Sequence, residues 1–109
     1  MPNPFKPIEG RTQNIAATSS AGSFRLSPAD MNASSTVRIL NTGANPVFVR
    51  ASNSAAPGGA VAATTTVDLP VAAGATVILS RDPFIDTYSF VYAAAQSGTV
   101  YLTPGTGGN

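Results

Sequence analysis

The stretch TVRILNTGANPVFVRA, residues Thr36–Ala51, decides the fold class. In each half apolar and polar residues alternate, with Val37 and Ile39 on one face of the first half and Val47 and Val49 on one face of the second. A period of two is typical of a β-strand with one buried face. The intervening NTGANP is rich in residues that favour a short turn. We therefore predict a β-hairpin, with Val47 and Val49 facing the core.

Similar short runs occur along the rest of the chain. They predict strands at residues 11–18, 22–27, 60–65 (weak), 75–80, 87–94 and 99–103, and residues 28–35 as a single helical turn or a loop. We expect the last two strands to form a second hairpin across the turn Gln96–Gly98. The continuous apolar run Val77–Leu79 predicts a strand covered on both faces.

Seven or eight short antiparallel strands with almost no helix indicate an all-β protein. We predict a β-sandwich, with a jelly-roll-like arrangement as the first choice. The expected domain spans residues 11–104, preceded by an extended Pro-rich arm at residues 1–10 and followed by a flexible tail at residues 105–109. The chain of 109 residues is long enough for one domain.

The composition excludes several classes of function. Charged residues make up 10% of the chain, and the net charge is +1, so no basic surface for nucleic acid is expected. Cys and His are absent, which removes disulfides, thiol nucleophiles and the commonest general base. No apolar run is long enough for a signal peptide or a membrane span. We expect no enzyme activity, no metal and no cofactor.

Two groups of residues merit a test for chemistry. Asp82 and Asp86 lie close together in RDPFID, where a catalytic or calcium-binding pair is less favoured than turn and capping roles. Tyr88, Phe90 and Tyr92 share one face of a predicted strand. We expect these rings to fill the core, whereas exposed tyrosines in one row, with Tyr101 among them, would indicate carbohydrate binding.

The N-terminal arm is the predicted partner-binding site. Three prolines within seven residues exclude a helix and keep the segment extended. Phe5 and Ile8 are apolar side chains on this arm, and such side chains usually lie against the same domain or a neighbour. The candidate partner-binding residues are Pro2, Pro4, Phe5, Pro7 and Ile8.

Three segments carry a resemblance to a known class of protein: NTGANPVFVR (Asn41–Arg50), LPVAAGATVIL (Leu69–Leu79) and GTVYLTPGTG (Gly98–Gly107). In this order they resemble the small decoration, or cement, proteins of tailed bacteriophages, over roughly residues 33–107. The resemblance implies a jelly-roll or β-sandwich module on the outside of the capsid, where it reinforces contacts between capsomers.

The same resemblance implies the partners and the location. The expected partners are the major capsid protein and further copies of the chain, in a dimer or trimer, with no nucleic acid and no membrane. The protein would be made in the host cytoplasm and located on the exterior of the virion. Two alternatives remain open: another phage structural part, such as a head fibre base or a tail component, and a non-catalytic carbohydrate-binding module.

Overall fold

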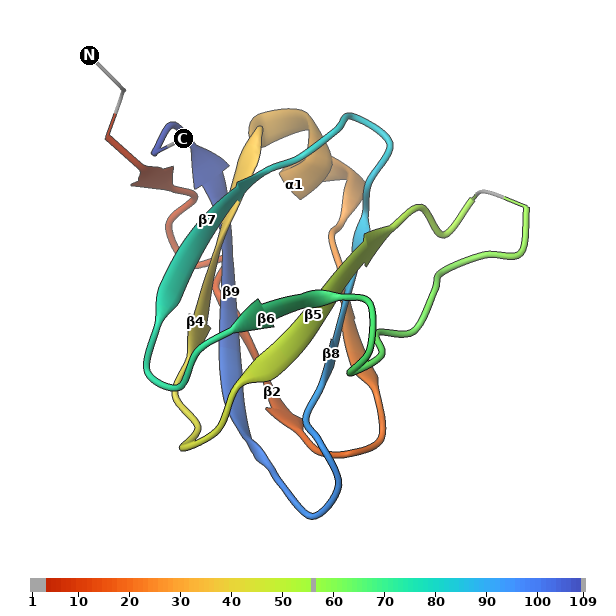
Figure 1. The fold of residues 1–109 in the computed structure, drawn as a ribbon. Coiled ribbons are helices and arrows are strands. Elements are labelled where there is room, and N and C mark those ends of the chain that lie inside the picture. The colour runs from red at the N-terminus through yellow and green to blue at the C-terminus, as the bar shows by residue number, and fades with distance from the viewer. Residues whose placement is uncertain (1–3, 56, 109) are drawn as a thin grey trace.

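The computed structural model describes residues 4–55 and 57–108, and these form two antiparallel sheets packed face to face (Figure 1). Sheet A holds β1, β2, β9, β4 and β7, and sheet B has the order β3-β8-β5-β6. The strands are β1 (Lys6–Pro7), β2 (Gln13–Ala17), β3 (Gly22–Arg25), β4 (Thr36–Asn41), β5 (Val47–Ser52), β6 (Leu69–Val71), β7 (Thr76–Ser80), β8 (Thr87–Val91) and β9 (Gly98–Thr106). The single helix of the described residues, α1 (Pro28–Ala33), connects β3 to β4.

The strand order confirms the predicted all-β sandwich and is that of a jelly roll. In sheet A the strands lie in the spatial order β2-β9-β4-β7, and they face the strands of sheet B, which lie in the order β3-β8-β5-β6. From β2 onward, consecutive strands lie in different sheets, except for β5 and β6, which pair with each other. Two four-stranded sheets wound together in this way are the jelly-roll arrangement.

Both predicted hairpins are wrong. β4 belongs to sheet A and pairs with β9 and β7, whereas β5 belongs to sheet B and pairs with β8 and β6. β8 and β9 are likewise in opposite sheets. The loops at residues 42–46 and 92–97 therefore cross from one sheet to the other. A short loop rich in Gly and Asn is compatible with either path, and alternation within each strand does not identify its neighbour.

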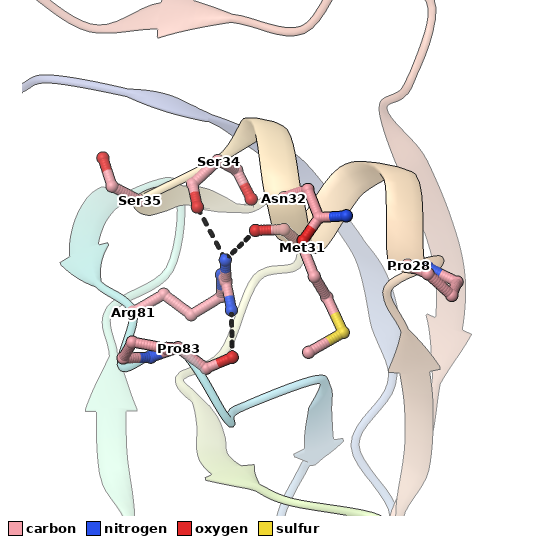
Figure 2. A pocket seen from close by; sticks show the side chains of 7 residues that line it. All are labelled: Pro28, Met31, Asn32, Ser34, Ser35, Arg81 and Pro83. Atoms are coloured by element: carbon pink, nitrogen blue, oxygen red, sulfur yellow. Dashed lines mark hydrogen bonds between the residues drawn. The ribbon is translucent and has the colours of Figure 1, made fainter.

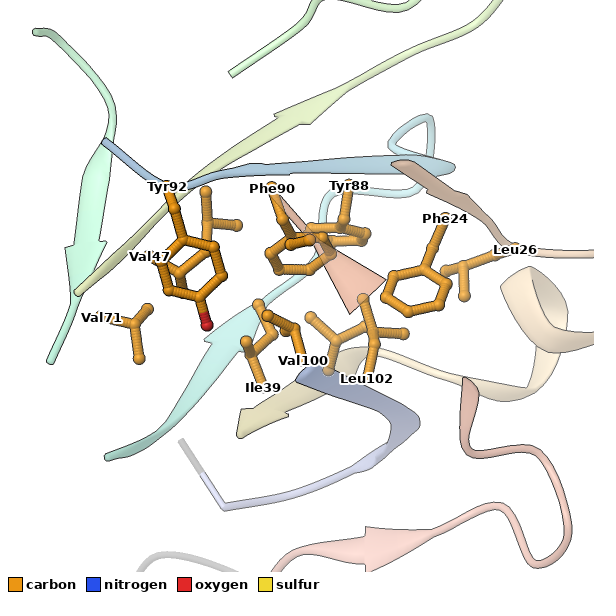
Figure 3. Packing of buried hydrophobic residues seen from close by; sticks show 13 residues of the cluster. Phe24, Leu26, Ile39, Val47, Val71, Tyr88, Phe90, Tyr92, Val100 and Leu102 are labelled. Carbon is orange, nitrogen blue, oxygen red and sulfur yellow. The ribbon is translucent and has the colours of Figure 1, made fainter. Parts of the chain in front are cut away.

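The alternation nevertheless places the core correctly. Val37, Ile39, Val47 and Val49 are all buried, as expected for strands with one face in the interior. They join inward-facing side chains of both sheets in one cluster (Figure 3). The cluster comprises Ala17, Phe24, Leu26, Val37, Ile39, Val47, Val49, Val71, Tyr88, Phe90, Tyr92, Val100 and Leu102.

Tyr88, Phe90 and Tyr92 fill the core, as expected. Their side chains are at most 1% exposed. The ring of Phe90 packs edge to face against that of Phe24, with centroids 5.4 Å apart and planes at 78°. Aromatic pairs prefer this geometry. An exposed row of tyrosines therefore does not form, because only Tyr101, at 37% exposure, is accessible.

Several elements differ from their predicted bounds. Residues 60–65 form no strand, whereas Leu69–Val71, expected as a loop, form β6. Residues 28–33 are helical, and Ser27 caps α1 by accepting a hydrogen bond from the Asp30 amide. The run Val77–Leu79 is half-buried, because β7 lies at the edge of sheet A and pairs only with β4.

The arm and the C-terminal segment pack on the domain itself. β1 pairs with Gly105 and Thr106 of β9. The predicted domain boundary at residue 104 therefore lies inside β9. The side chain of Phe5 lies against Gly105, where an added Cβ would come within 2.8 Å of the ring. Ser35 and Thr36 hydrogen bond to the carbonyls of Gly105 and Gly107.

Candidate interaction surface

The buried carboxylates are all engaged in holding loops, beginning with Asp30. Arg11 donates to both of its oxygens at 2.9 Å, and this ion pair joins the segment before β2 to α1. The hydrogen bond from Arg11 is the largest contribution that lowers the pKa of the Asp30 carboxyl below its usual value. Both oxygens of Asp30 are thus engaged by Arg11, in an ion pair that holds α1 in place.

Asp86 fixes the start of the long connection between β5 and β6. It accepts hydrogen bonds from the amide and hydroxyl of Ser54 at 2.9 and 2.5 Å, and from the Thr87 hydroxyl at 3.0 Å. Burial by itself raises the pKa of Asp86, but these hydrogen bonds and Arg25, 3.4 Å away, outweigh it and leave the pKa lowered. Asp82 is exposed, so the pair Asp82 and Asp86 does not share a buried cleft.

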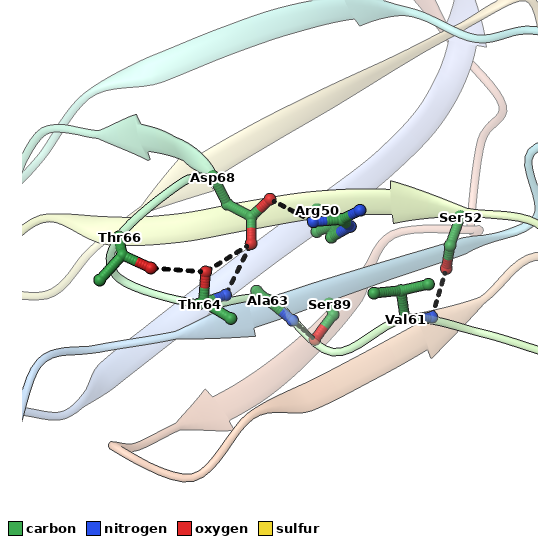
Figure 4. A network of polar contacts seen from close by, with 8 residues as sticks. All are labelled: Arg50, Ser52, Val61, Ala63, Thr64, Thr66, Asp68 and Ser89. Carbon is green, nitrogen blue, oxygen red and sulfur yellow. Dashed lines mark hydrogen bonds and ion pairs between the residues drawn. The ribbon is translucent and has the colours of Figure 1, made fainter.

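The same connection covers the outer face of sheet B (Figure 4). Asp68 accepts from Arg50 at 3.2 Å and from the amide of Thr64 at 2.6 Å. Further along, the amide of Ala63 donates to the Ser89 hydroxyl at 2.9 Å. Ser89 therefore lies beneath the loop, although its side chain points away from the core. Sheet B has little of its outer face free for a partner.

The outer face of sheet A is open around Arg38 and Tyr101, although Phe5 and residues 107–108 cover its end at Thr36 and Ile78. A shallow hollow of about 190 Å³ lies on it, lined by Thr12, Arg38, Leu40, Tyr101 and Thr103. Arg38 is exposed and makes no ion pair with any described residue, while Tyr101 exposes 37% of its surface. The hydroxyls of Thr12 and Thr103 lie 2.8 Å apart at its edge. This hollow combines a free cation, an accessible ring and hydroxyl groups.

Strand pairing brings Arg38 and Tyr101 together. Arg38 is the partner of Thr103 in the ladder between β4 and β9, and Leu40 is the partner of Tyr101. Alternation in TVRILN and TVYLT already puts Arg38 and Tyr101 on outward faces. What the sequence did not reveal is that the two strands are neighbours, so this hollow was missed as a candidate site.

A larger cavity of about 440 Å³ lies beside α1 (Figure 2). Its floor is Arg81, whose guanidinium donates to the carbonyls of Ser34 at 2.6 Å and Ile85 at 3.0 Å, and also to that of Met31. These bonds tie the end of α1 to the loop at residues 81–86. The carbonyls engage Nη1 and Nη2 of the guanidinium, whereas the buried Nε has no hydrogen-bond partner among the described residues. Phe84, at 74% exposure, lies on this loop.

The predicted partner-binding residues of the arm lie along the edge of sheet A. Pro7 is exposed within β1, and the amide of Ile8 donates to the Pro104 carbonyl at 2.9 Å. Pro4 is exposed and Phe5 is half-buried. Pro2 lies outside the described residues. The described arm residues thus line one border of the outer face of sheet A, and their role in binding a partner stays a prediction.

The buried carboxylates of the described residues hold loops in place, and the accessible surfaces lie elsewhere. Within residues 4–55 and 57–108, no group of three or more acidic, His or Cys side chains could hold a metal ion. No helix in the described part is long and apolar enough to cross a bilayer. Each buried carboxylate is occupied by a structural hydrogen bond. The accessible features of the described residues are the part of the sheet A face around Arg38 and Tyr101 and the side chain of Phe84.

Comparisons with known proteins identify the fold and no family. No protein-family description matches the chain, and no curated protein does either. Among solved structures, a protein called PirA is similar, with a TM-score of 0.58 and 16% identity over 89% of this chain and 98% of that chain. At this identity the similarity supports the sandwich architecture alone, because one fold serves many functions.

Proposed function

We propose that the protein is a non-catalytic structural module that attaches to a larger protein assembly and reinforces it. The observation that carries this proposal is the contrast between the two sheets. The outer face of sheet B is covered by the chain's own loop, whereas that of sheet A is covered only at one end, by the arm and residues 107–108, and is open around Arg38 and Tyr101. A module of this kind needs surfaces for docking and no reactive groups.

The assembly we propose is the outer surface of a tailed-phage capsid. Support for this choice comes from the sequence resemblance of Asn41–Arg50, Leu69–Leu79 and Gly98–Gly107 to capsid decoration proteins. Jelly-roll folds are common among viral capsid and lectin domains, which is compatible with the choice but does not establish it. The low charge of the chain lets many copies crowd on a lattice with little repulsion, and many weak contacts then add through multivalency.

The test is co-sedimentation of the purified chain with expanded, empty phage heads. We expect saturable binding and heads that survive a higher temperature when coated. A chain lacking residues 1–9 should still fold, because β1 contributes only two paired residues to sheet A, and should bind more weakly. Heads that bind no protein at saturating concentration would contradict the capsid assignment.

The docking face is tested by charge reversal. Arg38→Glu should weaken binding to heads, since Arg38 is exposed at the centre of the open face. Ala44→Glu is the control, because Ala44 is also exposed but lies in the loop between β4 and β5. Equal affinity of both variants would show that the open face of sheet A is not the docking surface.

Carbohydrate binding is the second candidate, and the hollow beside Tyr101 favours it. A sugar ring can stack on the exposed tyrosine while Arg38 donates to its hydroxyl or carboxylate groups. Tyr101→Ala should then abolish binding to a glycan array while leaving the thermal stability close to that of the wild type. Binding to no glycan on the array would remove this candidate.

A further inference from the structure

Arg81 is a buried cation without a carboxylate partner. Only 8% of the residue is exposed. Its guanidinium donates to backbone carbonyls on two sides, those of the 81–86 loop through Nη1 and those of Met31 and Ser34 through Nη2. No aspartate or glutamate of the described residues forms an ion pair with it. Carbonyl groups carry only partial charges, whereas a buried side-chain charge is usually paired with an opposite one.

Other arginines of the chain have the partner that Arg81 lacks. Arg11, Arg25 and Arg50 each pair with an aspartate, although between 39% and 72% of their side chains is exposed. Asp82 follows Arg81 in the sequence, but it is exposed and makes no ion pair with it. The guanidinium that is most deeply buried is therefore one without a counter-charge, and burial is where a missing counter-charge costs most.

One donor of Arg81 also lacks an acceptor. Nε is buried and has no hydrogen-bond partner among the described residues. In a planar guanidinium the Nε–H bond points the same way as one Nη2–H bond, as in Arg11, whose Nε and Nη2 both bond to Asp30. The acceptors of Nη2 in Arg81 are the carbonyls of Met31 and Ser34, and both residues line the cavity beside α1. The Nε–H group therefore points to the side of the cavity.

The cavity has the size and the lining of a site for a small ligand. Its volume of about 440 Å³ lies within the usual range of such sites, roughly 300–1,000 Å³. Pro28, Met31 and Pro83 give it apolar walls (Figure 2). Asn32 and Ser35 are exposed and bring an amide and a hydroxyl to the lining. Apolar walls with a few polar groups are typical of pockets that hold one end of a ligand by its polar group.

We propose that this cavity binds a carboxylate, which supplies the counter-charge that Arg81 lacks and accepts a hydrogen bond from its Nε–H group. A guanidinium fork matches the planar carboxylate group, and the charges strengthen each hydrogen bond. Because Nε lies beneath the wall, a part of the wall must move on binding. The unbranched, half-buried side chain of Met31 is suited to that movement.

The first test is a titration of the full chain with isovalerate, followed by the NMR signals of arginine Nε–H groups at constant ionic strength. We expect the Arg81 signal to move saturably. The Arg50 signal should stay in place, because this guanidinium is already paired with Asp68. Isovaleramide has the same shape without the charge and should leave the Arg81 signal unmoved. No movement at high millimolar isovalerate, or an equal response to the amide, would overturn the proposal.

A charge at the cavity tests the site without altering Arg81, whose replacement is expected to loosen α1. Asn32→Asp adds a carboxylate to the lining and should weaken isovalerate binding several-fold, because like charges repel. Asn14→Asp is the control, since Asn14 is also exposed but lies on β2 and does not line the cavity. It should keep the wild-type affinity. Equal affinities of the two variants would contradict a site at Arg81.

A second probe, a glutamate peptide blocked at both ends, identifies the source of the carboxylate. Tighter binding of isovalerate would assign the cavity to a free organic acid, whereas tighter binding of the peptide would assign it to an acidic side chain of a partner protein. Both results support the proposal, and binding of neither probe contradicts it. The cavity is lined by other residues than the hollow at Arg38 and Tyr101, so attachment to phage heads and carboxylate binding can fail separately.

Discussion

The hydroxyl of Tyr92 donates a 2.5 Å hydrogen bond to Oδ1 of Asn41, and both side chains are almost wholly buried. The side-chain nitrogen of Asn41, Nδ2, in turn donates to the backbone carbonyls of Asn45 and Val71 at 2.8 and 3.0 Å. One side chain thereby joins the loop after β4, the end of β6 and the end of β8. This polar cluster holds the two sheets together where the chain crosses between them.

The first prediction is that removing the Tyr92 hydroxyl lowers the free energy of unfolding less than removing the Asn41 side chain does. Tyr92→Phe removes one donor and should lower the free energy of unfolding by roughly 1–2 kcal/mol. Asn41→Ala also deprives several buried carbonyls of their donor and should cost about 3 kcal/mol or more. Urea unfolding of both single variants and of the double variant measures the coupling. Strictly additive losses would mean that the hydrogen bond contributes nothing.

Gly98→Ala tests the close contact beneath this cluster. A Cβ at Gly98 would lie 2.5 Å from the Tyr92 hydroxyl and 2.7 Å from the Cα of Gly43, which is backbone and cannot swing away. We expect a loss of roughly 1–3 kcal/mol from overpacking, measured by thermal unfolding. Gly58→Ala is a control for local crowding, because nothing lies within 4 Å of a Cβ there, although its positive φ adds a small backbone penalty. A fully stable Gly98→Ala variant would contradict the packing of the two loops.

Arg81 should be essential for the attachment of α1. Its guanidinium bridges carbonyls of α1 and of the 81–86 loop, and neither Met nor Lys can make the same set of bonds. Both Arg81→Met and Arg81→Lys should therefore lower stability by about 3 kcal/mol or more. The matched variant is Arg38→Met, which changes an exposed arginine and should alter stability little. Similar stability of all three variants would rule out the bridging role.

Val49→Asp should unfold the domain. Val49 is only 4% exposed and faces the interior from β5. An ionised carboxylate there would lack a partner, and a domain of this size has a total stability of only about 5–15 kcal/mol. Circular dichroism should show the loss of strand structure. The exposed neighbour Ala51 provides the control, since Ala51→Asp should fold normally.

Alkaline pH should destabilise the protein through Tyr88. Burial raises the pKa of Tyr88 from 10.0 to about 12. The folded state therefore holds this proton more tightly than the unfolded state. The resulting stability is complete below pH 10 and is lost as pH rises through about 12, a change on the order of 2–3 kcal/mol. Urea midpoints measured between pH 9 and about pH 12 should fall less in Tyr88→Phe than in the wild type.

Local features of the fold were predictable because they depend on nearest neighbours in the sequence. The alternation of Val47 and Val49 identified their buried face, and the bulk of Tyr88 and Phe90 placed these rings in the core. Pro28 and Asp30 marked a possible helical turn, which the structure contains. Each of these inferences requires only the pattern within one element.

Pairing between strands was not predictable in the same way. β4 pairs with β9 across some sixty residues of chain, and no pattern in TVRILN specifies that partner. β6 was missed because Pro70 and its short length suggest a loop, whereas an edge position accommodates proline. The hollow between Arg38 and Tyr101 was missed for the same reason, since it exists only once β4 and β9 are neighbours.

The central place of β9 also constrains how the protein can be made. In sheet A this last strand lies between β4 on one side and β1 and β2 on the other. During synthesis the earlier strands of sheet A must wait for β9, because Gly98–Thr106 leaves the ribosome after them. Sheet A therefore cannot close until β9 has been made, and its distant pairings favour slow folding. A chain that terminated before Gly98 would expose both β2 and β4 to aggregation, so quality control in the cell would act on incomplete chains rather than on folded protein.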